Sequence, residues 1–211
     1  MSQHFYSRVT QLYNLMDLDH DNYIDRLEAQ YCLTLCYNTV HNTQNNSVID
    51  ISDDREKHVM VEQQVQWLFD ATNEINTITL EEFKLCYGNL LMNAYEEEVL
   101  QIDLDRAIHE LDTNQSRLNA IALLNTAKLY YNNVTTQPNT NKQSILLDTL
   151  HSIEKQCSGP KQAKLISNYI NDTLNNTTDI TIQQFTQIYK YIITLQSIDI
   201  QQLAAQLATQ T

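Results

Sequence analysis

Glycine and proline are almost absent from this chain, which has two of each among 211 residues. Because these residues interrupt regular structure, their scarcity favours long helices. The sequence also lacks a glycine-rich phosphate loop, a G-x-S-x-G motif, a zinc-spaced His/Cys set and a nucleophile beside a base. We therefore expect a helical protein that is not an enzyme and has no catalytic residues.

Long apolar runs and basic residues are also scarce. No run could span a bilayer, and the N-terminus lacks the apolar core of a secretory signal, so we expect a cytoplasmic protein, with signal-independent export left open. Lys and Arg number 13 against 26 Asp and Glu, which gives a net charge of −13. This charge disfavours nucleic acid and anionic membranes as partners and suits a cation or a basic helix.

The four cysteines do not indicate a disulfide framework in a chain without a secretory signal. Cys32 and Cys36 lie four residues apart, beside apolar residues, on one face of an expected helix. We expect a buried core pair there rather than a metal or redox site.

The segment 17–28 has the spacing of a calcium-binding loop. Carboxylates stand at its first, third, fifth, ninth and twelfth positions, which are Asp17, Asp19, Asp21, Asp25 and Glu28. Calcium takes about six to eight oxygen ligands, and this spacing can wrap a short loop around one ion. We expect side-chain oxygens from the first three aspartates and the main-chain carbonyl from Tyr23. Asp25 would bind directly or through water, and Glu28 with both oxygens.

Asn22 stands at the sixth position, where the D-x-[DN]-x-[DN]-G-x5-E pattern has glycine. This position needs a left-handed backbone, which asparagine tolerates. All other positions match, and the chain here resembles the EF-hand superfamily. Helical spacing before and after the loop agrees, at Phe5, Val9, Leu12, Met16 and at Ala29, Cys32, Leu33, Cys36. The alternative is a solvated acidic turn between two helices.

An internal repeat indicates the architecture. Segment 12–17 resembles 107–112, and 69–83 aligns without gaps on 171–185. The resemblance then implies an all-α fold of two paired EF-hand lobes, at 1–96 and 97–211. Paired loops would be joined by minimal β-bridges, from Ile24 to Ile78 and from Leu118 to Ile180.

Apolar periodicity predicts ten helices, and the polar segments 39–55 and 132–142 are expected to be exposed connections. The predicted helices span 4–16, 27–38, 57–69, 80–93, 97–111, 119–131, 143–156, 161–171, 182–196 and 198–209. The last of these would be an amphipathic helix docked in the second lobe, or else a frayed polar tail.

The second loop is one residue too long for the pattern. Counted back from Ile78, its first and fifth positions are Ala71 and Ile75, which offer no side-chain oxygen. An irregular calcium site could still form here from Asn73, Glu74 and either Glu81 or Glu82.

The third and fourth loops are expected to bind no calcium tightly. The third keeps Asp112, Asn114 and Ser116 but has Ala122 where the first loop has Glu28. The fourth ends in neutral amides; its polar residues are Asp172, Asn175, Asn176, Asp179, Gln183 and Gln184.

Unequal use of four loops, with a long connection between the first two, resembles the sarcoplasmic calcium-binding proteins and their bacterial relatives such as calerythrin. This resemblance implies a compact body that buffers calcium more than it signals. One intact loop and an extra helix at 143–156 depart from that family. A buffer and a sensor therefore both stay open, and a sensor would open an apolar groove for a helical peptide of a protein partner. The alternative is a calcium-independent EF-hand-like scaffold or adaptor that binds a protein.

Overall fold

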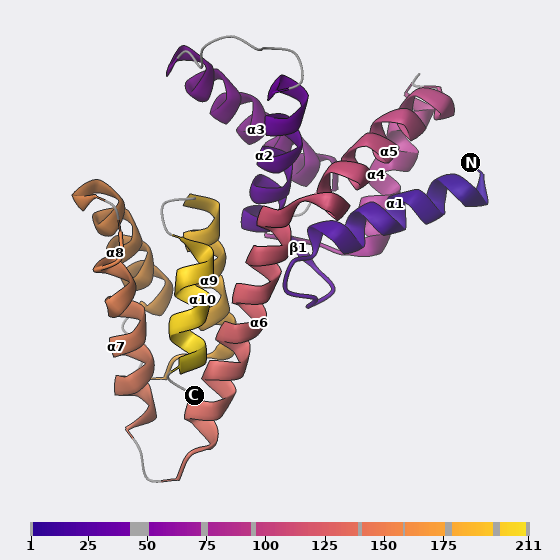
Figure 1. Cartoon of the computed structure of the whole chain (residues 1–211). Helices are drawn as coiled ribbons and strands as arrows, with labels where there is room; N and C mark the ends of the chain where they lie inside the picture. The colour runs from indigo at the N-terminus through magenta and orange to yellow at the C-terminus, as the bar shows by residue number, and fades with distance from the viewer. Residues whose placement is uncertain are drawn as a thin grey trace. The chain divides into compact units, whose positions relative to one another are not determined.

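The chain is mostly helical in its computed structural model, which describes residues 2–42, 51–72, 76–93, 96–138, 141–157, 159–175, 179–195 and 199–209 (Figure 1). Within these ranges the only sheet is a two-stranded antiparallel one. The all-α prediction is therefore confirmed. Among the same residues, no helix combines the length and the apolar character needed to cross a membrane.

The helices divide between two compact units, Met1–Arg117 and Leu118–Thr211. The first unit holds α1 (Gln3–Met16), β1 (Ile24–Asp25), α2 (Arg26–Asn42), α3 (Ile51–Thr72), β2 (Thr77–Ile78), α4 (Leu80–Met92) and α5 (Glu97–Thr113). The second holds most of α6 (Gln115–Thr136), then α7 (Lys142–Glu154), α8 (Pro160–Leu174), α9 (Ile182–Leu195) and α10 (Ile200–Thr209).

Each of the ten predicted helical segments coincides with one of these helices, although several helices are longer than predicted. Helix α2 continues to Asn42 rather than ending at residue 38. Helix α3 begins at Ile51 rather than at residue 57, and α6 continues to Thr136 rather than ending at residue 131. The segments expected to be connections are thus partly helical. Residues 43–50, within the first of them, lie outside the described residues.

The short sheet pairs Ile24 with Ile78 and Asp25 with Thr77. The first pair is the bridge that the sequence predicts. Both isoleucine side chains are fully buried, so the loop after α1 and the loop before α4 are held together by main-chain pairing and by an apolar contact.

Helix α5 packs along α1 and also contacts α2, so it belongs to the first unit (Figure 1). Arg8 Nε donates a hydrogen bond of 2.6 Å to Asp105 Oδ1 between α1 and α5. The boundary between the compact units consequently falls after Arg117, not at the expected 96/97.

The predicted third loop is wrong. Only Asn114 separates α5 from α6, and its side-chain oxygen accepts hydrogen bonds from the N–H groups of Ser116 and Arg117, at 3.0 and 3.3 Å. Asn114 therefore caps a helix. Because Leu118 lies inside α6 and is half-exposed, the predicted bridge from Leu118 to Ile180 is wrong as well.

The C-terminal helix is packed rather than frayed. Leu203 and Leu207 of α10 are both buried, at the helical spacing of one turn. Gln156, just after α7, donates a side-chain hydrogen bond to Gln206. These contacts favour the docked helix over the polar tail.

Arg117 is a buried cation at the start of α6, with 5% of its surface exposed. Its Nε donates a hydrogen bond of 2.7 Å to the carbonyl of Leu15, in the last turn of α1. Beside it, the hydroxyl of Tyr31 donates to the carbonyl of Ser116 at 2.9 Å. The last carbonyls of a helix have no partner within the helix, so Arg117 satisfies one of them.

Replacing Arg117 with methionine should destabilise the first unit by about 1–3 kcal/mol, because the partly buried Leu15 carbonyl would lose its charged donor. The measurement is urea unfolding of metal-free protein, followed by Trp67 fluorescence. Arg117→Lys is the control: it keeps the charge, and we expect it to recover part of the loss. Unchanged stability of Arg117→Met would show that the hydrogen bond contributes nothing.

Candidate metal centre

The acidic loop begins where α1 ends. Asp17 directly follows Met16, and its N–H still donates to the carbonyl of Tyr13 at 3.0 Å. The chain then turns through two left-handed residues, His20 at φ 57° and Asn22 at φ 69°. The left-handed Asn22 is the conformation that the loop pattern requires, whereas that of His20 was not predicted.

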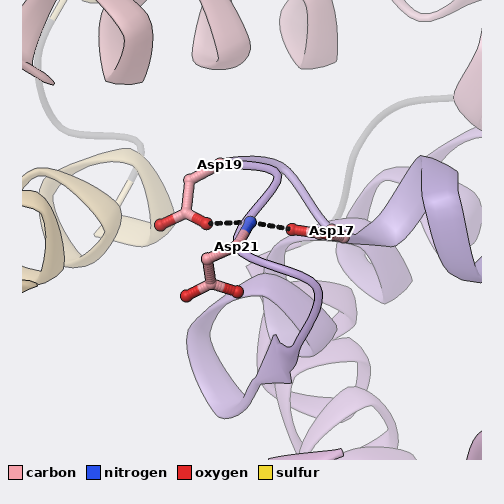
Figure 2. A group of neighbouring side chains, drawn as sticks. All are labelled: Asp17, Asp19 and Asp21. Atoms are coloured by element: carbon pink, nitrogen blue, oxygen red, sulfur yellow. Dashed lines mark hydrogen bonds between the residues drawn. The ribbon is translucent and has the colours of Figure 1, made fainter. Parts of the chain in front are cut away.

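Three aspartates converge in the first half of the loop (Figure 2). One carboxylate oxygen from each of Asp17, Asp19 and Asp21 lies within 4.8 Å of the others. The N–H of Asp21 donates to both Asp17 Oδ1 and Asp19 Oδ1 at 3.2 Å, and that of Asn22 donates to Asp17 Oδ2 at 3.1 Å. Main-chain donors thus hold the carboxylates in place from inside the turn.

Glu28 reaches across the loop from the first turn of α2. Its Oε1 accepts hydrogen bonds from the N–H groups of Leu18 and Asp19, at 3.0 and 3.3 Å. Its Oε2 accepts from the N–H of Asp25 at 3.0 Å, while Asp25 Oδ1 accepts from the N–H of Glu28 at 2.9 Å. The closing carboxylate therefore contacts both halves of the loop.

Tyr23 is the one predicted ligand that would act through its main chain. Its side chain is 45% exposed, and its N–H donates to Asp21 Oδ1 at 2.9 Å. Of the predicted ligands, the structure thus brings the side chains of Asp17, Asp19 and Asp21 together, and main-chain hydrogen bonds join Glu28 and Asp25 to the same loop.

Burial sets the electrostatics of this loop. The exposed fractions are 5% for Asp17, 6% for Asp19, 9% for Asp25 and 1% for Glu28. Burial also raises the pKa of the Asp17 carboxyl above its usual range, against the opposing effect of the N–H donors of Asn22 and Asp21. Carboxylates gathered in so little water are costly unless a cation neutralises them.

Tyr13 is a residue of this site that sequence reasoning missed. Its hydroxyl donates to two main-chain carbonyls, that of Asn22 at 2.5 Å and that of Ile78 at 3.3 Å. Burial and then the nearby carboxylates raise its pKa, so the hydroxyl remains a donor. The only sequence signal was an aromatic residue four positions before Asp17. Tyr13 thus ties the acidic loop to the strand that pairs with it.

Calcium affinity at this loop should fall as pH falls through the raised pKa of Asp17, because a protonated carboxyl is a poor ligand for a hard cation. The stability of the metal-free protein should depend on pH in the opposite direction. Because the pKa of Asp17 is raised on folding, the folded chain binds the Asp17 proton more tightly than the unfolded chain, and the stability that this proton contributes is present at low pH and lost as pH rises. We therefore expect calcium to raise the melting temperature more at about pH 7.5 than at about pH 5. Equal shifts at both values would contradict a role for Asp17 as a ligand.

The other predicted loops do not gather carboxylates. Glu82 accepts from the N–H and hydroxyl of Thr79, both at 2.7 Å, and so caps α4. Glu81 is exposed and pairs with Lys84 at 2.9 Å. Asn73, Glu74, Ile75 and Asn176 lie outside the described residues. In the part of the chain that the structure describes, Asp17, Asp19 and Asp21 are the only group of this kind.

The cysteine pair of α2 lies in the core of the first unit, with Cys32 buried and Cys36 partly so. Burial raises the pKa of both thiols, that of Cys36 to about 12. Both groups therefore stay protonated, as expected of a core pair rather than of reactive or metal-binding thiolates.

Comparison with protein-family models, with curated proteins and with solved structures gives no significant match to this chain. The functional argument consequently depends on the residues and contacts described above.

Proposed function

We propose that this protein binds one calcium ion through Asp17, Asp19, Asp21, Tyr23, Asp25 and Glu28, in an EF-hand-like loop of its first unit. The observation that carries the proposal is the burial of four carboxylates in one short loop, with Glu28 reaching across it from α2. A bound divalent cation would neutralise these groups in place.

The donor set favours calcium over other cations. All the proposed ligands are carboxylate or carbonyl oxygens, which suit hard cations and not zinc or copper. Glu28 can offer both oxygens, and a flexible loop with many oxygens suits calcium better than magnesium, which demands a near-ideal octahedron. The left-handed Asn22 lets the loop close around an ion.

A sensor rather than a buffer is favoured by a second feature of the first unit. A cavity of about 890 Å³ lies among α1 to α5, and its apolar lining includes Met16, Leu68, Phe83 and Leu104. Met16 directly precedes the acidic loop, so a change in the loop would reach the cavity wall. With a net charge of −13, the suitable occupant is a basic amphipathic helix of a protein partner.

The test is calorimetric titration of the metal-free chain with calcium, and with magnesium as the control, while Trp67 fluorescence is followed. Trp67 lines the same cavity and is 47% exposed. One calcium site with a change in emission supports the sensor, and one site with silent emission supports a buffer. No binding would overturn the proposal and leave the calcium-independent scaffold.

A further inference from the structure

The second unit repeats the first helix pair of the first unit. Buried positions of α1 and α2 recur on α6 and α7, each 118 positions further along, and the same spacing relates Tyr13 to the partly buried Tyr131. The matching pairs are Phe5 and Leu123, Val9 and Ala127, Leu12 and Tyr130, Met16 and Val134, Cys32 and Leu150, Leu35 and Ile153. Since the same spacing holds on both sides of the connection, residues 135–146 correspond in sequence to the acidic loop, although α6 and α7 extend further into this segment than α1 and α2 do.

Polar and aromatic contacts recur as well. The Tyr131 hydroxyl donates to the carbonyl of Ile180 at 2.8 Å, as that of Tyr13 does to Ile78. Phe185 lies 5.1 Å from Tyr189 between ring centroids, and Phe83 lies 5.2 Å from Tyr87.

The helix caps complete the match. Thr181 and Gln184 exchange the same capping hydrogen bonds as Thr79 and Glu82. These side-chain contacts are thus common to the two units.

The copied loop has lost every carboxylate. Residues 135–146 correspond without a gap to 17–28, and the first position, Asp17, becomes Thr135. Leu146 replaces Glu28 and is fully buried, so the carboxylate that closes the first loop has become part of an apolar core.

Two polar side chains, those of Lys142 and Gln143, make hydrogen bonds in the segment that corresponds to the acidic loop. The ammonium of Lys142 donates to the carbonyl of Thr135, near the end of α6, where a cation is favoured by the helix dipole. Gln143 Oε1 accepts from the N–H of Ile180 at 2.7 Å, whereas the equivalent Ile78 is paired in the sheet. Lys142 stands at the position of Ile24, and Gln143 at that of Asp25.

We infer that the second unit is a metal-independent copy of the first, in which the tethered ammonium of Lys142 serves at the loop in place of a free cation. The contrast with a metal-binding first unit rests on the proposed function, but the role of Lys142 does not. This arrangement keeps the second unit folded whether or not calcium is present, and confines the response to calcium to the first unit.

The test is amide hydrogen exchange of the full chain, with and without calcium, for wild type, Lys142→Met and Lys142→Arg. Methionine keeps the aliphatic stem without the charge. We expect Lys142→Met to exchange at least about tenfold faster in segments 131–146 and 179–185, whereas Lys142→Arg should stay close to wild type. Calcium should slow exchange in 17–28 and leave 131–146 unchanged in all three proteins.

Two results would overturn the inference: wild-type exchange rates in Lys142→Met, or slowing of 131–146 by calcium. The failure of the proposed function has a different signature. Calcium would then leave segment 17–28 unchanged, while Lys142→Met would still loosen the second unit.

Discussion

Glu28→Gln is expected to weaken calcium binding by at least about 100-fold, because the loop loses the charge and the paired oxygens that close it. The change keeps the size of the side chain. It also places an amide NH₂ at a carboxylate that now accepts from the main-chain N–H groups of Leu18, Asp19 and Asp25. Calorimetric titration of the variant beside wild type measures the loss.

Glu82→Gln provides a matched control within the same unit. Glu82 caps α4 through Thr79, and in the second unit Gln184 already makes the corresponding cap with Thr181. The same chemical change should therefore be tolerated at residue 82, with calcium affinity within about threefold of wild type. Full affinity in Glu28→Gln, or an equal loss in Glu82→Gln, would contradict the assignment of the site to the first loop.

Helical periodicity was enough to locate the helices, but not their ends. Asn132, Asn133, Thr135 and Thr136 suggested a connection because asparagine and threonine are poor helix formers. The helix continues there because Val134 is buried and the Tyr131 hydroxyl bonds to Ile180. These are tertiary contacts that a local pattern does not contain.

The site shows the same division between local and distant information. The spacing of residues predicted both the cluster of aspartates and the left-handed backbone of Asn22, because all of these residues lie in one short segment of the sequence. Tyr13 could not be found in this way, since its partners Asn22 and Ile78 come from two loops that are far apart in sequence. Its counterpart Tyr131 becomes recognisable only once both contacts are seen.

The predicted third loop failed for a chemical reason. Asp112, Asn114 and Ser116 have the residue types of ligands, but the same short polar side chains also cap helices, and Asn114 does so here. The true counterpart of the first loop carries Thr135 and Leu146 at its two ends. Because residues 135–146 contain no carboxylate, no calcium-loop motif identifies this segment in the sequence.

Phe185→Ala should destabilise the second unit by about 3–5 kcal/mol, because the ring is fully buried beside Tyr131 and Tyr189. Phe83→Ala is its counterpart in the first unit, where the ring lies 5.7 Å from that of Tyr13. Trp67 is the only tryptophan, so its fluorescence follows the first unit while circular dichroism follows both. We expect Phe185→Ala to lower the dichroism midpoint in urea and to spare both the Trp67 transition and calcium affinity, whereas Phe83→Ala should lower all three. If the two variants instead shift both signals alike, the units unfold together, and the milder Phe→Leu pair would show whether calcium affinity still follows Phe83 alone.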